Sequence, residues 1–130
     1  DTDRSRGLGD VYKRQIKEDM MNKQVLPEIK NPEVLEKAIK KYGVSIQSDM
    51  AIEEMSELTK AILKNRRIWR FGSEEELKKQ IGNIVEEAAD VLITVVQVIM
   101  MYDHEGKVQD IVDFKINRLR ERLEKEEITQ

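Results

Sequence analysis

Two short acidic clusters hold the side chains of this sequence that are best suited to chemistry. They span 53–57 (EEMSE) and 86–90 (EEAAD), and both lie in segments whose apolar residues recur at helical spacing. Each cluster offers an i,i+3 pair of carboxylates on one helical face, namely Glu54 with Glu57 and Glu87 with Asp90. Antiparallel packing of two consecutive helices would bring these four together. Oxygen ligands without His or Cys favour a hard cation, Mg²⁺ or Mn²⁺.

The position of the carboxylates on their helices argues against an ordinary solvent face. On a helical wheel, Glu54 falls inside the apolar arc of the first segment, Glu57 lies at its edge and Glu53 points further out. The second segment is apolar over most of its circumference. Its narrow polar stripe consists of Asn83, Glu86, Glu87, Asp90, Thr94 and Gln97. No Lys or Arg occurs within 81–106, although basic residues are frequent elsewhere.

A solvated acidic face is the plain alternative, because Glu-rich helices usually carry lysines at i,i+3 or i,i+4. Glu57 has Lys60 at that spacing. The corresponding function is a non-enzymatic helical assembly or interaction module whose acidic face meets a partner. Divalent ions separate the two hypotheses, because only a metal site gains stability when the ion relieves the repulsion between its carboxylates.

Composition restricts the class of protein. The 130 residues suffice for one domain, and 38% charged and 5% aromatic residues with two prolines favour an all-α fold. There is no Cys, so thiolate metal sites and disulfides are excluded. The net charge of −3 argues against a nucleic-acid binder, and the apolar run 88–102 is too short to span a membrane. We expect a cytoplasmic protein.

The sequence predicts an N-terminal arm, one helical domain and a short C-terminal tail. Residues 1–15 (DTDRSRGLGDVYKRQ) end in a string that resembles translated sequencing-adapter read-through, so we expect 1–31 to be an artefactual or irregular arm. Residues 32–125 form the helical domain, and 126–130 a frayed tail.

Start and stop signals predict the helices of that domain. Pro32 and Gly43 bound a helix over 32–42, and a second covers 45–65, followed by a loop over 66–72. Ser73 with Glu76 forms a capping box that opens a helix to 102, which Gly82 could bend or interrupt. A turn at 103–106 leads to a last helix over 107–125. These elements predict a four-helix-type bundle, and the apolar third helix predicts completion by a second subunit, in a dimer or tetramer.

Cations and an aromatic residue complete the candidate site. Lys115 lies inside the apolar arc of the last helix and Arg122 near its edge, so both either bind substrate phosphates or snorkel to water. Trp69, in the expected loop, could stack on a nucleobase, or it is a hydrophobic plug or subunit contact. His104 is expected to be an exposed turn residue. Redox iron is disfavoured, because di-iron bundles use Glu-x-x-His on two helices.

An ordered set of strings resembles a known family. The strings are 51–58 (AIEEMSEL), 86–91 (EEAADV) and 115–119 (KINRL). Together they resemble the MazG-like, all-α nucleoside triphosphate pyrophosphohydrolases of the small single-domain type, over roughly 35–123. The 29 residues from 58 to 86, between the two motifs, are slightly long for that family.

The resemblance implies a Mg²⁺-dependent enzyme that hydrolyses a (d)NTP to the (d)NMP and pyrophosphate. By motif match, the metal ligands would be Glu54, Glu57, Glu87 and Asp90. Glu54 would also orient the attacking water, and Glu53 would join the outer shell.

Overall fold

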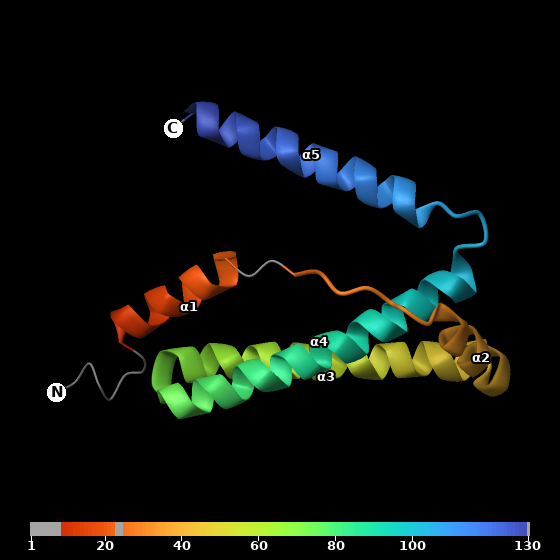
Figure 1. The fold of residues 1–130 in the computed structure, drawn as a ribbon, viewed down its shortest axis with the longest axis horizontal. Coiled ribbons are helices and arrows are strands. Elements are labelled where there is room, and N and C mark those ends of the chain that lie inside the picture. The colour runs from red at the N-terminus through yellow and green to blue at the C-terminus, as the bar shows by residue number, and fades with distance from the viewer. Residues whose placement is uncertain (1–8, 23–24, 130) are drawn as a thin grey trace.

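The computed structural model describes residues 9–22 and 25–129, and its regular structure is helical throughout (Figure 1). Five helices occur in these ranges: α1 (Asp10–Asn22), α2 (Pro32–Tyr42), α3 (Val44–Phe71), α4 (Glu74–Tyr102) and α5 (Val108–Thr129). The all-α class is therefore confirmed. Helices α3 and α4 form the main packed pair, and α2 contacts both of them.

A tight connection turns α3 back as α4. Gly72 and Ser73 alone separate the two helices. A Cβ built on Gly72 would lie 2.8 Å from Cγ2 of Ile68, so a larger residue would force this connection apart. Ser73 Oγ accepts from the backbone N–H of Glu76 at 3.2 Å and lies 3.2 Å from Oε1 of the same residue. The capping box at the start of α4 is thus confirmed as far as the Ser73 side chain is concerned.

Helix α2 has the expected ends. Pro32 occupies the first turn, where its missing N–H costs nothing. Gly43 follows with φ +92°, a left-handed value that disfavours side chains, and its N–H bonds the Ile39 carbonyl at 2.8 Å. Helix α3 begins directly after Gly43, so α2 and α3 meet at a sharp corner.

The contact between α3 and α4 is unusually polar. Its buried apolar residues are few: Ala51, Ala61, Leu77 and Met101. As many polar residues are buried: Gln47, Gln80, Thr94 and Gln97. Gln80 Nε2 donates to the Ala61 carbonyl at 2.8 Å, and Asn83 Nδ2 donates to Gln80 Oε1 at 3.2 Å. Part of the polar stripe of α4 therefore faces α3, which explains why it lacks basic residues.

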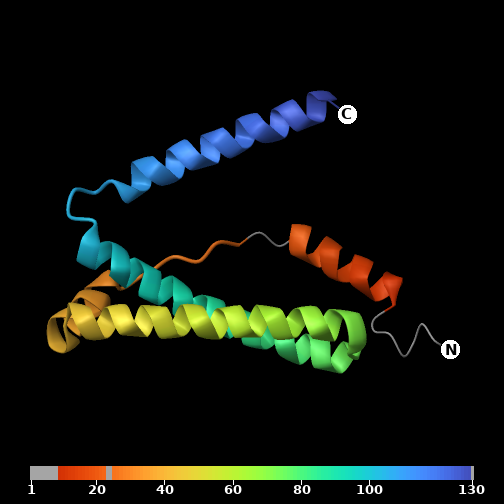
Figure 2. The same cartoon turned by 180° about the vertical axis from the view of Figure 1, so that it is seen from behind.

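Apolar surface remains exposed on the outer helices. The exposed large apolar side chains include Val85, Ile93 and Val95 on α4 and Ile111, Val112, Phe114, Ile116, Leu119 and Leu123 on α5. Helix α5 is exposed along its whole length after Val108. Figures 1 and 2 both show it standing apart from the α3–α4 pair.

One predicted irregular segment is helical instead, and one predicted helix is continuous through its glycine. The loop expected over 66–72 is wrong, because α3 continues to Phe71 and ends only at Gly72. The sequence between Asn65 and Gly72 contains no Pro or Gly, so nothing breaks the hydrogen-bond ladder earlier. Gly82 does not interrupt α4, which runs continuously from Glu74 to Tyr102.

The ends of the chain also differ from expectation. The irregular arm is wrong for residues 10–22, which form α1, whereas 25–31 have no regular structure. Helix α5 continues to Thr129, whose hydroxyl donates to the Lys125 carbonyl at 3.2 Å, so the tail is not frayed over 126–129. Residues 1–8, 23–24 and 130, which fall in the predicted arm and tail, lie outside the described residues. In the part of the chain that the structure describes, no helix has the length and apolar character needed to cross a membrane.

The turn between α4 and α5 is organised by one carboxylate. Asp103 Oδ1 accepts from the Lys107 N–H at 2.8 Å, and its Oδ2 accepts from the Val108 N–H at 3.0 Å. Gly106 adopts φ +70° and allows the chain to close around this side chain. These hydrogen bonds lower the pKa of Asp103, the Val108 N–H contributing most. His104 is an exposed residue of this turn, as predicted.

Candidate metal centre

Three carboxylates from two helices converge beside the polar seam. Glu54 from α3 and Glu87 and Asp90 from α4 each place one carboxylate oxygen so that the three oxygens lie within 4.8 Å of one another. All three residues are half-buried. Glu87 and Asp90 are one helical turn apart, so their side chains leave the same face of α4. Glu54 meets them from the opposite helix.

The register of the helix pair produces this convergence. On the side of the connection, Gln80 bonds the Ala61 carbonyl. At the far end, the hydroxyls of Ser48 and Tyr102 are 2.8 Å apart. Seven residues from the Gln80–Ala61 contact along each antiparallel helix lie Glu54 on α3 and Glu87 on α4, and Asp90 follows Glu87 by about one turn. The convergence therefore follows from helix geometry and needs no loop.

Partial burial and mutual repulsion of the carboxylates determine the electrostatics of the centre. The pKa of Glu54 is raised above its ordinary value, first by partial burial and then by the charges of Asp90 and Glu87. The pKa of Glu87 is raised by partial burial, then by Asp90, and then by Glu57. Partial burial and like charges both disfavour the ionised form, and a bound divalent cation would remove the second effect.

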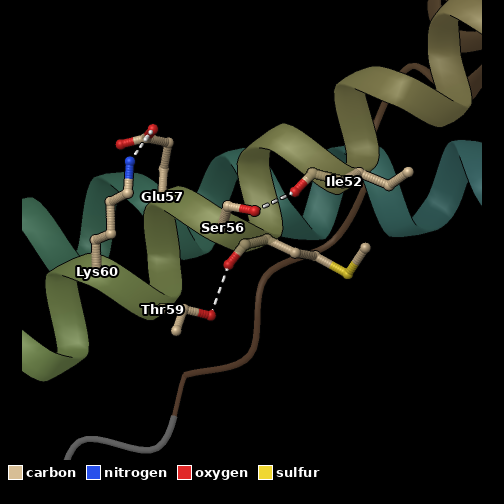
Figure 3. A network of polar contacts seen from close by, with 6 residues as sticks. Ile52, Ser56, Glu57, Thr59 and Lys60 are labelled. Atoms are coloured by element: carbon tan, nitrogen blue, oxygen red, sulfur yellow. Dashed lines mark hydrogen bonds and ion pairs between the residues drawn. The ribbon is translucent and has the colours of Figure 1, made fainter.

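Glu57 is the fourth predicted ligand and lies outside the converging group. It is half-buried, and its Oε1 lies 3.5 Å from Nζ of Lys60 in the i,i+3 ion pair shown in Figure 3. Its charge nevertheless contributes to the raised pKa values of both Glu54 and Glu87. The Glu57 carboxylate is thus close enough for its charge to affect these pKa values, although it forms its ion pair with Lys60.

The other polar residues near the first cluster are turned onto their own helix. Ser56 Oγ donates to the Ile52 carbonyl and Thr59 Oγ1 to the Met55 carbonyl, both at 2.9 Å (Figure 3). These hydroxyls are consequently not ligand candidates. Glu53 is exposed and outside the converging group, as its wheel position predicts. Glu86 is likewise exposed.

The predicted cations and the aromatic residue lie elsewhere within one chain. Lys115 and Arg122 are exposed on α5. Trp69 belongs to α3, not to a loop, and follows Glu54 by 15 residues, which is about 22 Å along a helix. Trp69 lies near the C-terminal end of α3, and Nζ of Lys13 is 5.6 Å from the centre of its ring. A single chain therefore does not bring Trp69 to the carboxylates.

Sequence reasoning identified the carboxylates and missed their surroundings. Gln47 and Gln80 are buried in the seam, yet neither was singled out, because an isolated Gln in a helical segment gives no periodic signal. The available signal was the absence of basic residues from 81–106, which marks the side of α4 that contacts α3.

The donor set fits a small divalent cation. Three carboxylate oxygens, half-buried and supplied by rigid helices, can occupy part of the coordination sphere of Mg²⁺ or Mn²⁺ and leave positions for water and phosphate oxygens. No protein-family model matches the chain, and neither a curated protein nor a solved structure matches it.

Proposed function

We propose that this protein is a Mg²⁺-dependent nucleoside triphosphate pyrophosphohydrolase, which converts a (d)NTP and water to the (d)NMP and pyrophosphate. The observation that carries the proposal is the convergence of Glu54, Glu87 and Asp90 across two packed helices. Mg²⁺ commonly bridges protein carboxylates and substrate phosphates, which makes a polyphosphate the substrate class that best fits an oxygen-only site. The resemblance of the ordered sequence strings to the MazG-like family supports a nucleoside triphosphate as this polyphosphate.

Each carboxylate has a role in the proposed reaction. Glu87 and Asp90 would hold the cation from α4, and Glu54 would hold it from α3. When bound, Mg²⁺ supplies charge neutralisation for the phosphates and lowers the pKa of a coordinated water. Glu54 is suited to orient a water for attack at the α-phosphorus, because it meets the two α4 carboxylates from the opposite helix. Glu57 would assist from its place beside Lys60.

The proposal includes assembly of at least two copies. Large apolar side chains are exposed on α4 and along α5, and a helix that is amphipathic but unpacked gains stability only when its apolar face is covered. Lys115 and Arg122 lie on that helix, so their proposed contact with substrate phosphates requires α5 to be placed against a carboxylate centre by assembly. A homodimer is the simplest arrangement, and a tetramer is compatible with the same surfaces.

A panel of NTPs and dNTPs tests the proposal directly. Pyrophosphate release should require Mg²⁺ or Mn²⁺ and should be absent from the Glu54→Gln variant. Glu53→Gln is the matched control, because Glu53 is an exposed neighbour outside the converging group. Absence of pyrophosphate release with every nucleotide and both metals would contradict the proposal.

A non-enzymatic assembly module is the second candidate, and the exposed apolar faces of α4 and α5 favour it. The two candidates differ in their response to metal. A carboxylate centre should gain thermal stability with Mg²⁺, since the ion relieves repulsion at Glu54 and Glu87. An assembly face should gain little, and the Glu54→Gln variant should then behave like the wild-type protein.

A further inference from the structure

A buried glutamine joins α3 and α4 two helical turns away from the metal centre. Gln80 of α4 is 3% exposed, and its Nε2 donates to the Ala61 carbonyl of α3 at 2.8 Å. Seven residues separate Gln80 from Glu87 and also Ala61 from Glu54, which corresponds to about 10 Å along each helix. The hydrogen bond therefore lies on the same faces of both helices as the carboxylates, and next to them.

The Gln80 side chain is not needed to satisfy buried backbone. Helix α3 is continuous around Ala61, so the Ala61 carbonyl already accepts the helical bond from the N–H of residue 65. Gln80 Oε1 accepts from Asn83 Nδ2 at 3.2 Å, and Asn83 is exposed and can bond water instead. Replacing a buried amide by an apolar group of similar shape is neutral or stabilising when no partner is left unpaired. Stability alone therefore does not account for this glutamine.

Packing by itself leaves the alignment of the two helices loosely defined. Ala51 and Ala61 are the buried apolar residues of α3, and their small side chains form shallow ridges. Neighbouring offsets and rotations of α4 therefore differ little in packing energy. Leu77, which is fully buried, lies close to the connection at Gly72 and Ser73 and constrains that end of the pair. A hydrogen bond has one preferred distance and direction, and a single buried polar residue can define the register of packed helices at a cost in stability.

We propose that Gln80 is a positioning residue, whose bond to the Ala61 carbonyl fixes the offset and rotation of α4 against α3 and thereby aligns the three carboxylates. It does so without adding to the stability of the metal-free fold. This inference rests on the metal centre of the proposed function and adds a residue that contacts neither metal nor substrate.

The metal makes a strict demand on this alignment. Mg²⁺ binds oxygen at about 2.0–2.1 Å in near-octahedral geometry. A shift by one residue moves a helix by about 1.5 Å along its axis and turns its side chains by about 100°. Such a shift would take Glu87 and Asp90 away from Glu54, whose oxygen lies within 4.8 Å of theirs.

The Gln80→Met variant tests the proposal, because methionine is unbranched, has a similar length and lacks the amide. Without metal, this variant should melt at the same temperature as the wild-type chain or higher. Its affinity for Mn²⁺ should fall by about 10-fold, the lower end of the effect of losing an outer-shell contact. Circular dichroism follows the melts, and the electron paramagnetic resonance signal of free Mn²⁺ measures the affinity well below the melting temperature. A contact that only stabilised the fold would change the melt and leave the Mn²⁺ affinity intact.

Gln47→Met is the matched control. Gln47 is 4% exposed and lies seven residues before Glu54, so it is about as buried as Gln80 and as far from the carboxylates. Among the described residues, its side chain hydrogen-bonds Met50 Sδ of its own helix at 3.8 Å and no residue of α4. Gln47→Met should therefore keep the wild-type affinity for Mn²⁺. The difference between the two variants separates the cross-helix bond from the loss of a buried amide.

Three results would overturn the proposal. The first is wild-type Mn²⁺ affinity in Gln80→Met. The second is a lower melting temperature of metal-free Gln80→Met, or its failure to fold, because the glutamine would then be an ordinary stabilising contact. The third is an equal loss of Mn²⁺ affinity in both variants.

The wild-type chain separates this inference from the proposed function. A wild-type chain that binds no Mn²⁺ would overturn both. A chain that binds Mn²⁺ but hydrolyses no nucleotide would contradict the proposed function alone, and the comparison of Gln80→Met with Gln47→Met would still decide the role of Gln80.

Discussion

Ser48 near the start of α3 and Tyr102 at the end of α4 bring their hydroxyl oxygens to 2.8 Å, across 54 residues of sequence. This contact and the bond from Gln80 to the Ala61 carbonyl bracket the carboxylate centre on both sides. The position of Glu54 opposite Glu87 and Asp90 is thus set by the register of two helices. Residues that fix the register should affect metal affinity even though they do not contact the metal.

Neutralising a ligand should separate activity from stability. Glu54→Gln and Asp90→Asn each remove a charge at nearly constant volume, so turnover should be lost. Without metal, both variants should be at least as stable as the wild-type protein, because repulsion within the cluster falls. Thermal melts with and without Mg²⁺, combined with pyrophosphate release, test this. A variant that keeps most of its activity would remove that residue from the centre.

The two neighbouring glutamates should differ sharply. Glu53 is exposed and outside the converging group, whereas Glu54 belongs to it. Glu53→Gln should therefore retain most of the turnover and of the stabilisation by Mg²⁺, and Glu54→Gln should lose both. Glu57→Gln should fall between them, since Glu57 pairs with Lys60 but still acts on the pKa of its neighbours. Equal losses at 53 and 54 would show that the cation is held differently.

Stability without metal should depend on pH in a direction set by Glu54 and Glu87. Their folded pKa values are raised above the ordinary value of 4.5, so the folded state binds protons more readily than the unfolded state. Their destabilising contribution should grow as the pH rises from about 4.5 through the folded pKa values. Melts between pH 4.5 and 7 should show this slope in wild type, and Glu54→Gln should flatten it. Saturating Mg²⁺ should also flatten it at the upper end.

Lys115 tests whether α5 reaches a carboxylate centre. Lys115→Met keeps most of the stem and removes the charge, so turnover should fall by roughly one to three orders of magnitude if the ammonium stabilises phosphate oxygens. Unchanged kinetics with equal stability would mean that Lys115 only snorkels.

If the contact is made between subunits, mixing the impaired Lys115→Met chain with the inactive Glu54→Gln chain should raise the activity above that of either variant alone. One site of each mixed dimer then combines an intact Lys115 with an intact Glu54. A mixture that gains no activity after subunit exchange would assign both residues to one chain.

Asp103 should control the first turn of α5. Its carboxylate accepts the Lys107 and Val108 N–H groups, so Asp103→Ala should weaken this turn, because two backbone donors lose their capping side chain. Hydrogen exchange at these amides measures the effect. Because the pKa of Asp103 is lowered, the stabilisation exists above the ordinary value of 3.8 and is lost as the pH falls through the folded pKa. Glu105→Ala is the control, since its contact is an exposed ion pair with Lys107.

Local signals predicted some elements well. Pro32 and Gly43 defined α2, and Ser73 with Glu76 defined the start of α4, because each acts on the backbone within a few residues. The extension of α3 over 66–71 (RRIWRF) was missed because three arginines and three large apolar residues without Gly or Pro are compatible with both helix and loop. Helix α1 was missed because its sequence has no clear apolar stripe.

The candidate site was predicted in part for a different reason. Wheel positions correctly separated Glu53 from Glu54, since adjacent residues on a helix point about 100° apart. They could not show that Glu57 turns toward Lys60, because side-chain rotamers decide that contact. Nor could they place Lys115, because the direction of α5 depends on the Asp103 turn and on what covers its apolar face.

The connection at Gly72 and Ser73 divides the α3–α4 pair into an inner half, next to the connection, and an outer half, next to Ser48 and Tyr102. The inner half, closed by Gln80 and Ala61, spans 19 residues of sequence, whereas the contact of Ser48 with Tyr102 spans 54. Opening from the Ser48–Tyr102 end therefore releases more chain entropy, and the contacts of α2 with both helices oppose it. Such opening would separate Glu54 from Asp90 while the inner halves of the two helices remain packed against each other. A cation bound by both residues would cross-link α3 and α4 and oppose this opening. The metal would then stabilise the helix pair in addition to serving as a cofactor.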